Sequence, residues 1–334
     1  VGNFIGVGTI VAAGGQVGVL ASNGMQAKSG VGGDAGATGN GGKSGFIDRN
    51  GNGGKGGNIY VTTTTGNIDL SPLIVAGGDV NSLYSVRTGN GGRGGTTNGN
   101  GGNSGSVGNN GDGGAGGSIF ISTFSGKIQP LGFQPTDPLQ KPVAFLAPGG
   151  PVRGIFAVTG IGGDATLGNG GSSGDIGNNG SGGKGGTVTI LSGIGDIKTP
   201  KGSIVTTGGD GGVGAGRTGD GGHSTFIGNA GSSGKIGHNG HGGDGSDVLI
   251  STLGILIVEG PVVSKGGVGN GNQSITGHGG TALIGRGGSS GRIGYGADGG
   301  HGGNITYIGA TKITTSETTV ASGGAVASGP YQPL

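Results

Sequence analysis

The sequence has no cysteine and no tryptophan, and only 4% of its 334 residues are aromatic. Without cysteine the chain has neither a disulfide framework nor thiol chemistry. With so few aromatic side chains, it also lacks the stacking platforms on which single-stranded nucleic acids bind. We therefore expect backbone hydrogen bonds and the packing of small side chains to hold the fold together.

Charge is scarce as well, since Asp, Glu, Lys and Arg make up 10% of the chain and the formal net charge is +2. Globular domains usually contain about 25% charged residues. This composition excludes a broad basic surface of the kind that binds nucleic acid. No apolar run approaches the roughly 18 residues that a membrane-spanning helix needs, so no membrane span is predicted.

Glycine accounts for 99 residues, and it recurs at every third position in five runs. The run at 168–186, GNGGSSGDIGNNGSGGKGG, has no break in this period. A helix repeats every 3.6 residues and a strand every two, whereas a polyproline II helix repeats every three. We therefore predict polyglycine II arms and essentially no α-helix, because each helical glycine costs about 1 kcal/mol. The other runs lie at 39–57, 99–117, 228–243 and 285–303.

Two alternatives share this composition or period. Collagen also has glycine at every third residue, but its other positions are rich in proline, and the five runs contain none. A disordered Gly/Ser linker is the second alternative. Linkers carry no register from one copy to the next, whereas these runs do, so we favour the ordered interpretation.

The register shows when the runs are aligned on their last residues. One column is then aliphatic in every copy, which predicts a stacked row of side chains. Each of them buries about 1.5–3 kcal/mol of transfer free energy. This stacking column consists of Ile47, Val107, Ile176, Ile236 and Ile293.

Each copy also contains three short apolar segments, a pattern typical of parallel β-solenoids. In one copy these are NIYVTTT at 58–64, NIDL at 67–70 and LIVAGGD at 73–79. Large side chains fall on both faces of the first segment, and Tyr60 is one of those on the outer face. We therefore expect this outer face to lie against the glycine arms. In the third copy we assign the third segment to GIFAVTG at 154–160.

The repeats predict one continuous all-β solenoid over residues 1–334, with the arms projecting from it or lying alongside it. The third copy holds a Pro-rich insertion at 129–153, which we interpret as a surface excursion or, alternatively, a lateral contact between subunits. The copies are 1–57 (partial), 58–117, 118–186, 187–246, 247–303 and 304–334 (partial).

Metal binding is weakly indicated. GGDGSDVLI at 242–250 matches the calcium-binding nonapeptide pattern, but other copies have GGKGGNIYV or GGAGGSIFI at this place. Acidic and histidine side chains also fall at equivalent positions of neighbouring copies, where a solvated charge ladder is the favoured interpretation. We therefore predict no metal or cofactor site and retain five candidate ligands, which are His241, Asp244, Asp247, Asp298 and His301.

No catalytic motif stands out. Dinucleotide and phosphate loops need a helix after the glycine turn, and none is predicted here. The sequence contains only two Glu, Glu259 and Glu317, and no repeated carboxylate pair marks a glycosidase. We expect that the protein is not an enzyme.

At GNGGKGG and GSGGKGG the sequence resembles secreted GGX-repeat proteins with bundled polyglycine II helices. These include snow flea antifreeze protein, phage tail-fibre tip adhesins and mycobacterial PE-PGRS proteins. The pattern TVTILSGIGDIKTPKGSIVTTGGDGG is similar to that of haemagglutinin-type bacterial β-helix adhesins. The resemblance implies a secreted or cell-surface protein.

We expect a structural filament subunit that stacks head to tail through open solenoid ends, because such ends are adhesive edges and heterologous contacts build filaments. Its partner is then another copy of itself. The alternative is an adhesin that binds cell-surface or matrix glycans. Ice binding ranks third, because the outward pair Tyr60 and Thr62 does not belong to a flat threonine array.

Overall fold

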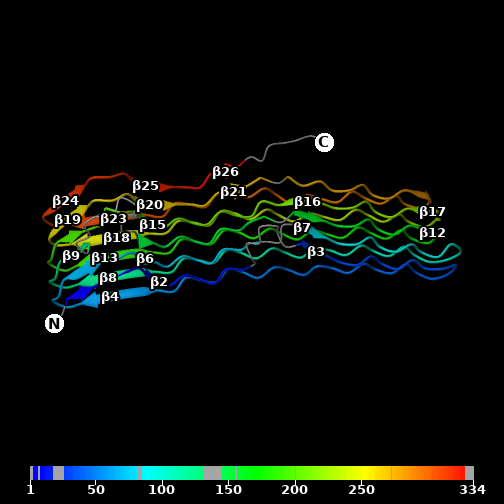
Figure 1. Cartoon of the computed structure of the whole chain (residues 1–334). Coiled ribbons are helices and arrows are strands. Elements are labelled where there is room, and N and C mark those ends of the chain that lie inside the picture. Colours follow the sequence, from blue (N-terminus) through cyan, green and yellow to red (C-terminus); the bar gives the residue numbers. More distant parts are fainter. Residues whose placement is uncertain are drawn as a thin grey trace, which may run out of the picture.

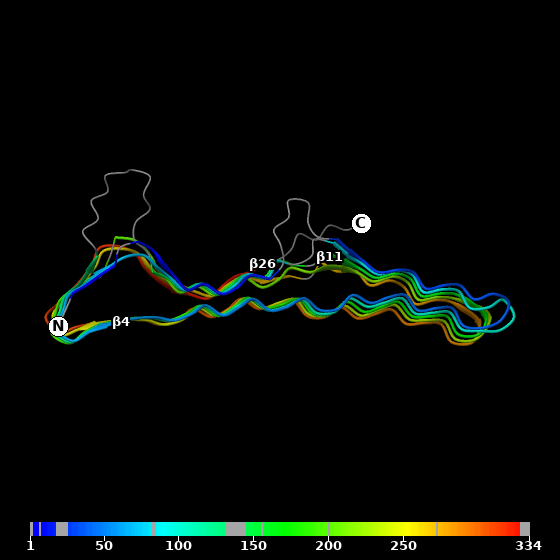
Figure 2. The same ribbon diagram turned by 60° about the horizontal axis from the view of Figure 1, so that its bottom comes forward.

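The computed structural model describes residues 3–327 except 7, 18–25, 82–84, 131–144, 155, 200 and 272. Over these residues the chain forms parallel β-sheets with neither an α-helix nor a closed barrel, which confirms the predicted all-β solenoid. Figures 1 and 2 show that each coil is flattened. Three short strands lie at one end, and a long glycine-rich excursion runs out from them and returns.

The first strand of each coil joins a sheet of five parallel strands, in which equivalent residues of successive coils are paired. Alternation directs every second side chain into the core, as in β4, where Ile59 and Val61 are buried. The strands are β4 (Ile59–Thr63), β8 (Ile119–Thr123), β13 (Val188–Ser192), β18 (Val248–Thr252) and β23 (Ile305–Gly309).

Two six-stranded parallel sheets close the other sides of the strand-bearing end. The second segments form β1 (Phe4–Ile5), β5 (Ile68–Leu70), β9 (Ile128–Pro130), β14 (Ile197–Lys198), β19 (Ile255–Val258) and β24 (Lys312–Thr315). The third segments form β2 (Ile10–Val11), β6 (Leu73–Ile74), β10 (Phe145–Leu146), β15 (Ile204–Val205), β20 (Val262–Lys265) and β25 (Thr319–Ser322).

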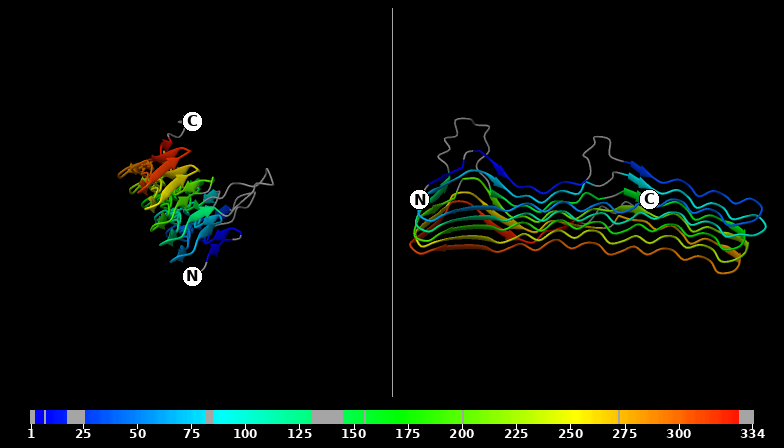
Figure 3. Two further views of the ribbon diagram at one scale, coloured as in Figure 1. Left: turned by 90° about the vertical axis from the view of Figure 1, so that its left-hand side faces the viewer. Right: turned by 90° about the horizontal axis from the view of Figure 1, so that it is seen from below.

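These three sheets enclose the main hydrophobic core, to which each coil contributes mostly Ile, Leu and Val. The prediction that glycine arms cover the outer face of the first strands is wrong. Tyr60 on that face is 67% exposed, because the arms extend away from the strands instead of folding back over them (Figure 3).

The third segment of the third copy lies at Phe145–Leu146, not at 154–160 as predicted. Phe145 pairs with Leu73 and Ile204 of the neighbouring coils and is fully buried. Gln129 and Pro130 belong to β9, and 156–158 belongs to an arm. The insertion is therefore shorter than 129–153, and its middle part, 131–144, lies outside the described residues.

The excursion of each coil has two halves. The outgoing arms (12–38, 75–98, 147–167, 206–227 and 266–284) lead from the third strand to the far tip, and the return arms (39–57, 99–117, 168–186, 228–246 and 285–303) lead back. The short strands of the outgoing arms and their tips are β3 (Gln26–Lys28), β7 (Ser85–Arg87), β11 (Phe156–Val158), β12 (Ala165–Leu167), β16 (Ala215–Arg217), β17 (Ser224–Ile227), β21 (Gly269–Asn270) and β22 (Ala282–Ile284), and β21 pairs with β26 (Val326–Ala327).

The arms form two layers, seen edge-on in Figure 2. Within a layer, every third N–H donates to the next coil, as Ile47, Asn50 and Gly53 do to the carbonyls of Ser106, Asn109 and Asp112. This spacing of three is the period that the glycine pattern predicts. The first glycine of each return arm turns the chain at the tip with positive φ, for example +134° at Gly99, where a side chain would be strained.

Glycine also lets the two layers touch. Gly114 donates its N–H to Gly78 O at 2.9 Å, Gly150 donates to Gly114 O at 2.8 Å, and Gly183 donates to Gly150 O at 2.9 Å. This zigzag links the outgoing and return layers through successive coils. A Cβ added at Gly182 of the return layer would lie 1.8 Å from Gly209 O of the outgoing layer, so a side chain cannot be accommodated there without moving backbone.

We predict that Gly182→Ala lowers the free energy of unfolding by about 1–3 kcal/mol or more, because the clash is with the backbone of the facing layer. Gly296→Ala is the matched control, since nothing lies within 4 Å of its added Cβ. Chemical denaturation followed by circular dichroism compares the two variants. Equal stability of both would contradict the close approach of the layers.

Candidate functional site

The structure places the five aliphatic residues of the stacking column side by side. Parallel bridges join Ile47 to Val107, Val107 to Ile176, Ile176 to Ile236 and Ile236 to Ile293. A second, smaller core lies between the layers, where Val107, Ile176 and Ile236 pack against Val86 and Ala157 of the outgoing arms. Ile47 is partly buried against this core, whereas Ile293 is 46% exposed. These outgoing partners did not show in the sequence, because β7 and β11 lack the threefold glycine pattern that marks the return arms.

The outward-facing residues of the arms form a side-chain ladder, which sequence reasoning did not identify. At many of these positions the backbone N–H donates to the side chain at the same position in the previous coil. Asn169 N–H donates to Asn100 Oδ1 at 2.8 Å, and Asn229 N–H donates to Asn169 Oδ1 at 2.8 Å. The ladder explains why Asn, Asp, Ser and His occupy these positions, since each offers an acceptor.

The five candidate metal ligands belong to this ladder. His241 Nδ1 accepts the N–H of Asp298 at 3.0 Å and lies 3.7 Å from its carboxylate Oδ2. Asp244 accepts the N–H of His301 at 2.7 Å, and Asp247 accepts that of Asn304 at 2.8 Å. In the part of the chain that the structure describes, no three such side chains gather closely enough to hold a metal ion.

Replacing a ladder acceptor tests this arrangement. We predict that Asn169→Ala lowers stability by about 0.5–1.5 kcal/mol, because the Asn229 N–H then has only water as its acceptor. Asn169→Asp keeps an oxygen at the same place and should retain most of the stability. Thermal or urea unfolding of both variants measures the difference, and an Ala variant as stable as the Asp variant would refute the ladder.

Asp79 is a carboxylate of the outgoing layer with a perturbed titration. Burial raises the pKa of Asp79, and the positive charge of Arg153 opposes part of this rise. A raised pKa in the folded state means that folding disfavours the ionised form. The contribution of Asp79 to stability therefore falls as the pH rises from the pKa of unfolded Asp, about 3.9, through the higher folded value.

We predict that Asp79→Asn is more stable than the unchanged chain at neutral pH, because it removes a partly buried charge. The advantage should shrink towards pH 3, about one unit below the unfolded pKa, where Asp79 is largely protonated. Urea unfolding of both proteins between pH 3 and neutral pH measures the difference in their free energies of unfolding. An advantage that does not depend on pH would contradict desolvation as its cause.

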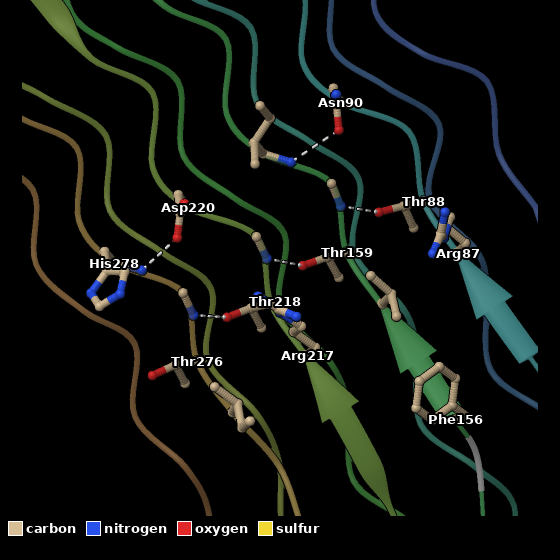
Figure 4. A pocket seen from close by; sticks show the side chains of 16 residues that line it. Arg87, Thr88, Asn90, Phe156, Thr159, Arg217, Thr218, Asp220, Thr276 and His278 are labelled. Atoms are coloured by element: carbon tan, nitrogen blue, oxygen red, sulfur yellow. Dashed lines mark hydrogen bonds between the residues drawn. The ribbon is translucent and has the colours of Figure 1, made fainter. Parts of the chain in front are cut away.

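The outer face of the outgoing layer contains a shallow groove of about 540 Å³. It crosses four coils and is shown in Figure 4. Its threonines belong to a ladder of their own, in which Gly219 N–H donates to Thr159 Oγ1 at 3.2 Å and Gly277 N–H donates to Thr218 Oγ1 at 3.0 Å. Above this hydrogen-bonded floor lie larger side chains, among them Arg87, Phe156 and Arg217.

Arg87 and Arg217 occupy the same column two coils apart, since both pair with Val158 of the coil between them. Figure 4 shows them on either side of the strand that carries Phe156. The Phe156 side chain is 51% exposed and has only Ala215 as its paired neighbour in the next coil. This arrangement of two cations around an aromatic ring was not apparent in the sequence, because the coil register that aligns them is a tertiary feature.

No family model and no curated protein matches the chain. Among solved structures it is similar to a springtail antifreeze protein from Granisotoma rainieri, a bundle of nine polyproline type II helices whose crystal waters match the ice lattice. The identity is 23% over 62% of this chain and 93% of that chain, with a TM-score of 0.10. A likeness at that TM-score carries no argument about function. Within the described residues, no helix is long and apolar enough to cross a membrane.

Proposed function

We propose that the chain is an extracellular structural subunit whose copies associate edge to edge into a filament. The supporting observation is that apolar side chains at the two edges of the solenoid are exposed, although their partners in the neighbouring coils are buried. Ile313 in β24 is 44% exposed, whereas its partner Leu256 in the preceding coil is fully buried. At the opposite edge Ile10 is 37% exposed, and its partner Leu73 is 1% exposed.

The two edges are complementary in their hydrogen bonding. Phe4 N–H donates to Asn67 O of the next coil, Ile68 donates to Lys127 O and Thr199 donates to Ile257 O. At β24 the equivalent N–H groups belong to Ile313 and Thr315, and the described residues contain no further coil to accept them. A second copy that places β1 on β24 and β2 on β25 offers carbonyls in the same parallel register.

The association is expected to depend on concentration. Only the sheets of second and third segments have six strands, whereas the sheet of first strands has five. Two stacked copies therefore meet through β24–β25 and β1–β2 and leave one row open beside the first strands. Such a junction is smaller than a complete coil-to-coil contact, so we expect filaments to grow above a threshold concentration. The resemblance to secreted glycine-rich repeats supports the extracellular placement.

A second candidate function is a surface adhesin. The observation that favours it is the groove between Arg87 and Arg217, because it places two arginines that form no ion pair among the described residues beside the half-exposed ring of Phe156. Adhesion and assembly use different surfaces, one on the flat face and one at the edge. The two functions are therefore compatible and can be tested separately.

We predict that Thr315→Pro shortens or abolishes filaments, because proline has no N–H to donate across the edge. The fold is compatible with proline in this row of the sheet, because Pro130 of β9 occupies it in an interior coil. Thr315→Val is the matched control, since Val258 occupies the same row and keeps its N–H. Negative-stain electron microscopy and sedimentation velocity across a concentration series measure assembly.

Circular dichroism and thermal unfolding of both variants control for loss of the fold. We expect the unchanged chain and Thr315→Val to form uniform unbranched filaments. Thr315→Pro should form only short particles. Monomers at all concentrations would overturn the proposal. Filaments of Thr315→Pro equal in length to those of the control would show that β24 is not the contact.

A further inference from the structure

The groove on the outgoing layer carries three exposed apolar side chains beside its two arginines. Phe156 is 51% exposed, and Ile161 and Ile275 are each 47% exposed. All three line the groove. At the position of Ile161 the neighbouring coils carry Asn90 and Asp220, which serve as ladder acceptors. Aliphatic and aromatic side chains at these positions contribute no acceptor, so the ladder does not account for them.

Positive charge lies beside these apolar side chains of the groove. The coils are spaced like strands in a sheet, so the Cα atoms of Arg87 and Arg217, two coils apart, are separated by about 9–10 Å. Among the described residues neither guanidinium forms an ion pair. Asp220 is the acidic residue of the groove, and its Oδ1 accepts the N–H of His278 at 2.7 Å. Both arginines are therefore available to a ligand.

We propose that this groove binds a carboxylated polysaccharide, an inference that rests on the adhesin candidate and not on filament formation. The C–H face of a sugar ring packs on Phe156, as apolar surfaces do on exposed aromatic rings. Arginine recognises carboxylates through paired, charge-assisted hydrogen bonds. Two arginines in one column suit a linear acidic chain that crosses successive coils and offers a carboxylate to each.

A nucleic acid fits the groove less well. Its backbone has one phosphate for each nucleotide, and binding it takes many cations along the contact. The groove has two arginines, and the whole chain has a net charge of +2. The groove also has a single aromatic ring, Phe156, whereas single-stranded nucleic acids stack successive bases on several. Two arginines beside exposed apolar side chains therefore favour an acidic sugar over a nucleic acid.

The test uses polygalacturonate oligomers as the probe and dextran as the neutral control, with isothermal titration calorimetry on the full chain. We expect binding of polygalacturonate that weakens with added salt, and no binding of dextran. Arg217→Ala and Phe156→Ala should each weaken binding about tenfold or more. Arg217→Lys should bind less tightly than the unchanged chain, because lysine cannot form the paired hydrogen bonds.

Arg292→Ala is the matched control, because Arg292 is an exposed arginine of the return layer, away from the groove. Its affinity should stay within about twofold of that of the unchanged chain. Thermal unfolding confirms that each variant is folded. No binding of polygalacturonate, an equal loss in Arg292→Ala, or tighter binding of single-stranded DNA or polyglutamate would each overturn the proposal.

The filament and the groove are tested independently. The titrations are repeated in the Thr315→Pro background, in which edge contacts are blocked. Binding that persists there supports the groove whatever the state of assembly. Binding that is lost together with assembly would overturn the groove as the site and place recognition in the filament. Filament formation itself is scored by microscopy without any saccharide.

Discussion

The structure depends on satisfying the backbone N–H groups of long arms that form no helix and little sheet. Buried backbone donors need partners, and the arms supply three kinds. One N–H in each triplet donates along the layer, as Gly53 does to Asp112 O. Another donates across the layers at glycine, as Gly114 does to Gly78 O. The third donates to a side chain of the previous coil, as Asn229 does to Asn169.

This constraint explains the unusual composition. Glycine is required where backbones meet across the layers, because a Cβ at Gly182 would lie 1.8 Å from the carbonyl oxygen of Gly209. Small acceptors are required on the outside, which accounts for Asn, Asp and Ser at those positions. Buried bulk lies mainly in the core of the strand-bearing end and in the small core around Val107 and Ile176. Aromatic and charged residues therefore have few places in the fold.

Departures from these rules carry the functional proposals. In the groove, Ile161 stands where the neighbouring coils carry polar acceptors and Phe156 is half-exposed. Arg87 and Arg217 lie beside them without a counter-ion among the described residues. At the edge, Ile313 is uncovered although its row is otherwise buried. Both are exposed features of a rigid, repetitive frame, which suits a role in contact and assembly. They also lie on different surfaces, so each can be altered without the other.

The glycine period and the strand segments determined the all-β class, the threefold geometry of the arms and the residues of the stacking column. These features are local or strictly periodic, so they can be predicted from the sequence. Tertiary structure alone decided that Phe145 is the third-strand residue of its coil, that the outward-facing Tyr60 is exposed to solvent and that histidine and aspartate serve as ladder acceptors. It also brought Arg87, Phe156 and Arg217 together. The reason is physical: these outcomes depend on which coils pair and in what register, and the intervening insertion and unequal coil lengths conceal that register in the sequence.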